Sequence, residues 1–210
     1  MGSILPLFFG FFSASIGIAL PGLINMTAAK VSIREGRERA LLFIAGALII
    51  VFFQTLSAII FARFLDSHPN VVVVLREVGL VIFILLTIYF LFLARKAKTK
   101  KEEMKIRSKT NRFFLGMLLS ALNFFPVPYY VFVTILLSSN HLFTFEMMHE
   151  FLFLTGVVLG SFAVFYYYIN FFKRIESKTD FFFKNMNTII GSITGIIALI
   201  TLINIIKYYY

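Results

Sequence analysis

The sequence contains no cysteine and no tryptophan, and few of its residues are charged. Without cysteine, the chain can form neither a disulfide nor a thiolate metal site. Only 14% of the 210 residues are charged, whereas 60% are hydrophobic and the mean hydropathy is +0.90. A soluble domain of this length cannot bury so much apolar surface, so the composition predicts a polytopic membrane protein.

Six apolar segments are long enough to cross a bilayer as helices, which takes about 20 residues each. They cover approximately residues 4–26, 40–62, 71–94, 113–137, 151–172 and 186–206. The alternating segments that are typical of transmembrane barrels are missing. We therefore predict an all-α fold, a single transmembrane domain of six helices over residues 1–210.

Lysine and arginine are distributed unevenly among the expected loops. The first loop holds four, the central loop nine and the fifth loop four; the remaining three are Arg63, Arg76 and Lys207. Because basic loops stay on the cytoplasmic side, both termini are expected outside. This topology in a lipid bilayer accounts for the net charge of +10, so no nucleic-acid partner is expected.

The basic linker at residues 95–112 separates two halves, 1–94 and 113–210, with three expected spans each. An odd number of spans per half gives the halves opposite orientations, the inverted-repeat plan of many transporters. A short internal match supports this plan. Gly10 follows two phenylalanines and precedes Pro21 by eleven residues, and Gly116 follows a similar Phe-Phe-Leu and precedes Pro126 by ten.

The fourth apolar segment predicts a broken helix. Pro126 and Pro128 each lack a backbone N–H, so the helix has to break or kink near Pro126. Asn123 adds an amide one turn earlier. Freed carbonyl groups at membrane depth need protein or a water-lined cavity around them, and transporters build binding sites at such breaks. The alternative is a proline kink that only shapes helix packing.

The first segment carries a second break, at Pro21-Gly22, with Asn25 beside it. Gln54 is the only side-chain amide in the second segment, where a buried amide is expected to face the bundle interior. Cross-linking of helices is the alternative role for Gln54. The candidate substrate-binding residues are Pro21, Gly22, Asn25, Gln54, Asn123, Pro126, Pro128, Tyr129 and Tyr130.

Glu77 is the one carboxylate expected inside the hydrocarbon boundary and is the candidate proton carrier. An interfacial ion pair with Arg76 is the alternative. Two glycine pairs, Gly156 with Gly160 and Gly191 with Gly195, form small faces that join helices within the bundle or join two chains in a homodimer. The sequence contains no catalytic, phosphate-binding or metal-binding motif, so we expect neither an enzyme nor a cofactor.

These features resemble the lysine exporter (LysE-type translocator) family. Residues 21–25, Pro-Gly-Leu-Ile-Asn, are similar to its Pro-Gly-Pro and Asn motif, with Leu23 in place of the second proline. Residues 34–37 resemble its basic Gly-Arg stretch, and Gly46 falls at its glycine in the second span. Asn123 and Pro126 form a stretched version of its Asn-Pro motif. The acidic residue that often follows in the second span has no counterpart here, where the nearest polar residue is Gln54.

The resemblance implies proton-driven export of amino acids or similar small metabolites across a bacterial cytoplasmic (inner) membrane. The half-helix N-termini at the breaks would hold a substrate carboxylate. The competing interpretation is a membrane assembly or scaffold protein whose kinks only set helix crossings. Whether the two breaks share a cavity distinguishes the two interpretations.

The charge distribution predicts the membrane topology. Reporter fusions at residue 104 should show a cytoplasmic location, and fusions at residue 144 and at the C-terminus should show an external one. A cytoplasmic C-terminus would contradict both the six-span topology and the inverted repeat.

Overall fold

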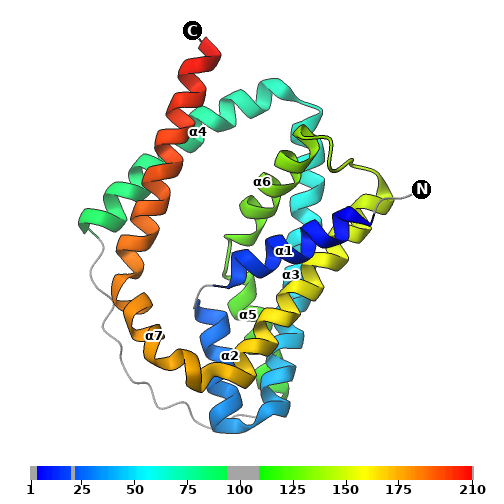
Figure 1. The fold of residues 1–210 in the computed structure, drawn as a ribbon, viewed down its shortest axis with the longest axis vertical. Helices are drawn as coiled ribbons and strands as arrows, with labels where there is room; N and C mark the ends of the chain where they lie inside the picture. The colour runs from blue at the N-terminus through cyan, green and yellow to red at the C-terminus, as the bar shows by residue number, and fades with distance from the viewer. Residues whose placement is uncertain (1–3, 20–21, 94–108, 210) are drawn as a thin grey trace. The chain divides into compact units, whose positions relative to one another are not determined.

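The computed structural model describes residues 4–19, 22–93 and 109–209, and each regular element in these ranges is a helix (Figure 1). The elements are α1 (Leu5–Ile18), α2 (Leu23–Glu35), α3 (Arg37–Asp66), α4 (Pro69–Ile88), the π-helical η1 (Tyr89–Leu93), α5 (Lys109–Ala121), α6 (Pro126–Ser139) and α7 (Met147–Tyr209). The predicted all-α class is confirmed. Most of the predicted linker at residues 95–112 lies outside the described residues; its last four residues begin α5.

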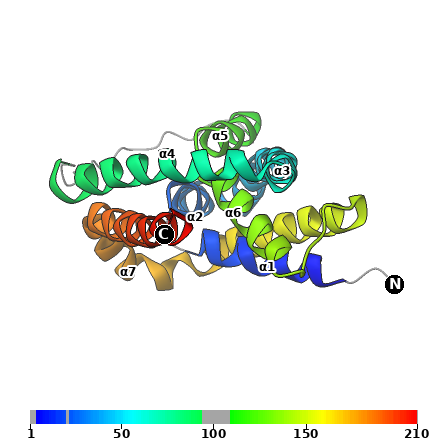
Figure 2. The same ribbon diagram turned by 90° about the horizontal axis from the view of Figure 1, so that it is seen from above.

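The helices form two compact units, and both halves of the chain contribute to each. Unit 1 comprises Met1–Asp66 and Met104–Arg174, and unit 2 comprises Ser67–Glu103 and Ile175–Tyr210. In unit 1, α3 packs on α2, α5 and α6 (Figure 2). The core of this unit contains Val31, Phe43 and Phe165, from α2, α3 and α7.

Two of the predicted spans are each built from two helices at an angle. The axes of α1 and α2 differ by 78°, and those of α5 and α6 differ by 58°. In the second pair, α5 ends at Ala121 and Pro126 is the first residue of α6. A proline is well tolerated there because a first-turn N–H has no partner within the helix. The predicted break near Pro126 is confirmed.

Two of the described helical segments are long and apolar enough to cross a membrane on their own, Arg37–Asp66 and Met147–Phe171. The two bent pairs bring this number to as many as four. Shorter apolar helices cover Gly79–Leu93 and Thr194–Lys207. Each predicted span overlaps one of these segments, and the number six stays a prediction.

The predicted fifth loop, at residues 173–185, is helical, because α7 runs without interruption through it. The chain contains no glycine or proline between Gly160 and Gly191, so no residue there favours the end of a helix. The basic charges of this segment mark a polar stretch of helix. The expectation of a loop was wrong.

The predicted first loop is also shorter than expected. Helix α2 continues to Glu35, and Gly36 alone separates it from α3. Gly36 has φ +93°, a conformation that glycine adopts without the strain other residues would incur. Lys30 and Arg34 are therefore helical residues of α2.

Glycines allow two very close helix crossings in unit 1. Gly46 of α3 meets Gly116 of α5: a Cβ added at Gly46 would lie 2.1 Å from the carbonyl oxygen of Phe113, and one added at Gly116 would lie 2.0 Å from that of Phe43. Such distances exclude any side chain. The two backbones are in direct contact.

The second crossing has the same register. Gly10 of α1 meets Gly156 of α7, with added Cβ atoms 2.2 Å from the Phe153 oxygen and 2.1 Å from the Leu7 oxygen. At both crossings, each glycine faces the residue three positions before its partner glycine. Gly160 also lies against α1, so the predicted role of the Gly156 and Gly160 face within the bundle is confirmed.

In unit 2, the predicted glycine face of Gly191 and Gly195 contacts other helical residues. Gly191 lies against Leu91 and Gly195 against Thr87, while the Thr87 hydroxyl donates to the Thr194 Oγ1 at 3.0 Å. The face joins α7 to the α4–η1 segment. This helix-joining role was also predicted.

The close crossing predicts that Gly116→Ala is destabilising. The new methyl group would collide with the backbone of α3 at Phe43, and overpacking of this kind typically costs about 1–3 kcal/mol. Thermal unfolding of the purified protein in detergent measures the change. Gly79→Ala is the control: its Cβ would meet only Phe83 at 4.0 Å, so the substitution should be neutral or stabilising. Equal stability of Gly116→Ala and the native protein would contradict the packing argument.

Candidate functional site

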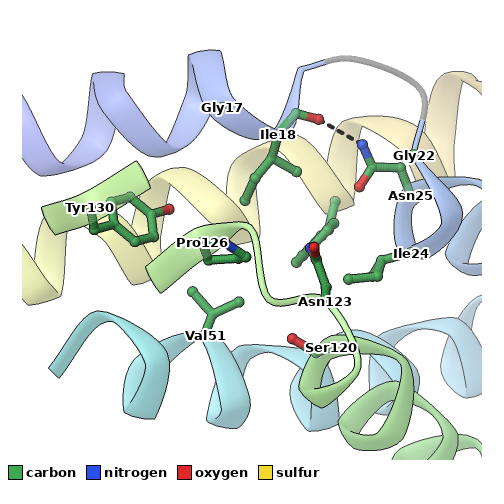
Figure 3. Close-up of a pocket in the computed structure, with 11 residues that line it drawn as sticks. Gly17, Ile18, Gly22, Ile24, Asn25, Val51, Ser120, Asn123, Pro126 and Tyr130 are labelled. Carbon is green, nitrogen blue, oxygen red and sulfur yellow. Dashed lines mark hydrogen bonds between the residues drawn. The ribbon is translucent and has the colours of Figure 1, made fainter. Parts of the chain in front are cut away.

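A cavity of about 110 Å³ lies in unit 1 where the two broken spans meet (Figure 3). The first half of the chain contributes Gly17, Ile18, Gly22, Ile24, Asn25 and Val51 to its lining. The second half contributes Ser120, Asn123, Pro126, Tyr130 and Phe165. The cavity thus borders the end of α1, the start of α2, the end of α5 and the start of α6.

The carbonyl groups at the end of α1 are satisfied by side chains. The amide nitrogen Nδ2 of Asn25, a residue only 3% exposed, donates to the Ile18 oxygen at 2.6 Å (Figure 3). The Tyr168 hydroxyl of α7 donates to the Ala19 oxygen at 2.9 Å and also interacts with the Asn25 side chain. Because these carbonyls lack helical N–H partners, the two side chains hold the end of α1 in place.

Gln54 donates hydrogen bonds to backbone carbonyl groups at the end of α5. Its Nε2 donates to the Ser120 oxygen at 3.1 Å and to the Asn123 oxygen at 2.8 Å. Both acceptors are carbonyl groups, so the amide has to present its nitrogen to them. The side chain of Asn123 accepts from the backbone N–H of Phe125 at 3.4 Å. One side chain from α3 thereby bridges the interrupted segment of the fourth span.

Five of the predicted site residues line the cavity. They are Gly22, Asn25, Asn123, Pro126 and Tyr130. Tyr130 and Asn25 are buried, whereas Asn123 is exposed at the junction between α5 and α6. The breaks at positions 22 and 126 therefore border one shared space.

The other predicted residues lie elsewhere. Gln54 supports the wall through the bonds above and is not part of the lining. Tyr129 reaches across to α1, where its hydroxyl donates to the Ser13 oxygen at 2.8 Å. Pro128 is exposed on α6, and Glu77 is exposed on α4 in unit 2. Pro21 lies outside the described residues.

Ser120 is a lining residue that the sequence analysis missed. It is 1% exposed, and its hydroxyl group is buried without a hydrogen-bond partner in the described part of the chain. Figure 3 shows this hydroxyl directed away from α5 toward the space between Val51 and Asn123. Its position one turn before the break, three residues from Asn123, is the signal that would have identified it.

A buried ion pair lies at the far end of α2 from the cavity. Arg112 of α5 donates to Glu35 through both Nε, at 2.7 Å, and Nη2, and the two side chains are only 2% and 1% exposed. We expected both residues in cytoplasmic loops. Glu35 lies about 18 Å along the helix from Leu23, the first residue of α2, and neither Glu35 nor Arg112 is a lining residue of the cavity.

The cavity offers hydrogen bonds and apolar contact. None of the lining residues in the described part of the chain is an acidic or basic residue. Within the described ranges, no group of three or more His, Asp or Glu side chains is placed to hold a metal ion. The arrangement is suited to binding a small molecule.

Long apolar helices and two bent helix pairs are the features of a multi-pass membrane protein. The model of the LysE type translocator family matches residues 15–204. The chain belongs to this family, as its motifs suggested, and members of this family are transporters. No protein of curated function and no solved structure matches the chain.

The role of Gln54 predicts a stability effect. Gln54→Leu would remove the side-chain donor of the Asn123 carbonyl and one of two donors of the Ser120 carbonyl, which also accepts from the Asn123 N–H. A typical hydrogen bond contributes about 0.5–1.5 kcal/mol to stability. The midpoint of thermal unfolding in detergent should therefore fall clearly below that of the native protein.

Thr55→Val is the matched control. Thr55 is buried one position further along α3, and its hydroxyl donates only within the helix, to the Val51 oxygen. Its replacement should change stability far less. Similar effects of the two substitutions would show that the bridge across the break contributes little.

Proposed function

We propose that the protein is a secondary active transporter that exports amino acids or related small metabolites across the bacterial cytoplasmic membrane in exchange for protons. The observation that carries this proposal is the cavity shared by the two broken spans. Breaks that only set helix crossings, as in a scaffold protein, would have no reason to share a cavity whose lining includes two side-chain amides and two hydroxyl-bearing residues. Membership of a translocator family supports the same conclusion.

The proposed architecture is two inverted repeats of three spans. The two glycine crossings support it: one joins α5 to α3, and the other joins α1 to α7. If α1–α2 corresponds to α5–α6 and α3 corresponds to the first part of α7, the two crossings are equivalent. Each then packs the broken span of one repeat on the second span of the other repeat. Their matching registers are what a pseudo-two-fold axis would produce.

Discontinuous helices supply the binding groups in this proposal. Backbone N–H groups at the start of a half-helix have no partner in the helix and carry its positive dipole end. In transporters, such ends face anionic groups of the substrate near the middle of the membrane. We assign this role to the start of α2, because Ile24 and Asn25 belong to the cavity lining.

The proposal also includes a membrane topology and a residue that carries the coupled proton. Both termini lie outside, and the basic segments face the cytoplasm. Glu77 remains the candidate proton carrier. Its exposed side chain on α4 lies in unit 2, so the proposed role in coupling is separate from substrate binding in the cavity.

The proposal predicts that Asn123→Ala abolishes export without loss of the protein. The substitution removes the side-chain amide from the cavity but keeps the backbone carbonyl to which Gln54 donates, so the stability cost should be about 1 kcal/mol or less. Extracellular metabolites of strains that produce the native or the variant protein would be compared, with the membrane content of each protein measured in parallel.

Asn140→Ala is the control for this test. Asn140 carries the same amide at the opposite end of α6, where its nitrogen donates to the Leu136 oxygen at 2.7 Å. This variant should export normally. Normal export by Asn123→Ala would remove that residue from the site, and the absence of any exported compound from the native strain would refute the transport function.

A further inference from the structure

The buried ion pair of Glu35 and Arg112 joins helices from the two halves of the chain. Glu35 is the last residue of α2, and Arg112 lies in the first described turn of α5. Arg112 donates to both carboxylate oxygens of Glu35, and both side chains are buried. Neither residue lines the cavity, so the proposed substrate binding does not account for this contact.

One face of α2 leads from the cavity to the ion pair. Ile24, Ala28, Val31 and Glu35 follow one another at intervals of three or four residues, which places them on one side of the helix. Ile24 lines the cavity, and Glu35 lies about 16 Å further along the helix. The same side of α2 therefore carries the cavity at one end and the carboxylate at the other.

Helix α5 has the same arrangement. Its buried residues are Arg112, Gly116 and Ser120, which are four positions apart and share one face. Ser120 lines the cavity, and Arg112 lies about 12 Å from it along the helix. The ion pair thus joins the two helix faces that border the cavity, at the ends away from it.

Apolar side chains occupy the intervening turns of both helices. Ala28 and Val31 of α2 belong to the buried core of unit 1, and Leu115 and Leu119 of α5 pack against this core. These contacts and the ion pair close the route that runs between α2 and α5 to the cavity.

A buried ion pair is suited to a contact that opens and closes. The loss of hydration on burial offsets much of the attraction between the two ions, so the pair adds little net stability to the closed state. Separation in a dry interior would leave each ion without a partner, at a high cost in free energy. Separation with entry of water restores the hydration of both. The ions therefore part only when water enters between α2 and α5.

The equivalent helices of the proposed repeats are joined without charge. If α1–α2 corresponds to α5–α6, the contact of α2 with α5 is equivalent to that of α6 with α1. Neither α1 nor α6 contains a charged residue. The Tyr129 hydroxyl of α6 donates to the Ser13 oxygen of α1 at 2.8 Å, and the Tyr129 ring packs on Gly17. An ion pair is therefore specific to the side of the cavity that faces α2 and α5.

We propose that the pair of Glu35 and Arg112 is the cytoplasmic gate of the cavity, and that its separation admits the substrate between α2 and α5. This role rests on the proposed transport function and topology, which place the pair on the cytoplasmic side. The pair is broken when the cavity opens to the cytoplasm. It is formed when the cavity is closed on that side.

The native chain contains no cysteine, which allows a direct test by thiol modification. Ser120→Cys places a single thiol group in the cavity lining, and a membrane-impermeant maleimide measures how fast this group is reached from each side. In inside-out vesicles, Glu35→Gln should raise the rate at least about tenfold, because the unpaired charge of Arg112 destabilises the closed state. In intact cells, where the reagent stays outside, the rate should not rise.

Two further variants show whether the ion pair itself is responsible. Glu35→Arg combined with Arg112→Glu restores an ion pair with the charges exchanged, so the rate in inside-out vesicles should return to within about threefold of the native rate. Glu38→Gln is the matched control, because Glu38 of α3 pairs with Lys109 of α5 close by in the sequence, and both side chains are exposed. An exposed pair contributes little, so this variant should leave the rate unchanged.

A second thiol position distinguishes opening of the gate from loss of structure. Thr55 is buried in α3 and does not line the cavity, so Thr55→Cys should stay unmodified in the Glu35→Gln variant. Modification at both positions would show that the pair only holds the fold together, and would overturn the gate. An unchanged rate at Ser120→Cys, a rise from the outside, or no recovery in the charge-exchanged variant would also overturn it.

Export by the native protein, measured in the same strains, separates the gate from the function on which it rests. Export without the rise in modification would overturn the gate and leave the transport function standing. The rise in a protein that exports no compound would refute the transport function, while closure of the cavity by the pair would stand. Export together with the rise supports both.

Discussion

The structure depends on the need to satisfy backbone carbonyl groups where two helices are interrupted in an apolar environment. Water cannot reach these groups freely in a membrane, so protein side chains have to supply the missing donors. Gln54 of α3 serves the break between α5 and α6, and Tyr168 of α7 serves the break between α1 and α2. Each donor comes from a helix distant in sequence. The bonds that make the breaks tolerable therefore also tie unit 1 together around the cavity.

Close backbone packing is the second condition for this arrangement. Without a hydrophobic driving force between helices in lipid, association relies on van der Waals contact, which small residues allow. Gly46 and Gly116 bring α3 against α5, and Gly10 and Gly156 bring α1 against α7. Both crossings lie in the helices next to a break. They hold α5 against α3 and α1 against α7, the helices that carry the donors Gln54 and Tyr168.

The sequence predicted the apolar segments and the breaks well, because proline and glycine act locally. Pro126 begins α6 as its missing N–H requires. Contacts between residues distant in sequence were harder to predict. Nothing in the local pattern pairs Glu35 with Arg112, and the predicted span boundaries placed both residues in loops. The polar segment at residues 173–185 was taken for a loop because its charges interrupt an apolar run, yet charge alone does not end a helix that lacks glycine and proline.

The buried charged side chains of unit 1 lie away from the cavity. The buried pair of Glu35 and Arg112 lies at the far end of α2, where each ion compensates the other. The lining residues that the structure describes include no acidic or basic side chain. Under the proposed transport function, a substrate would be held by hydrogen bonds and apolar contacts with these lining residues.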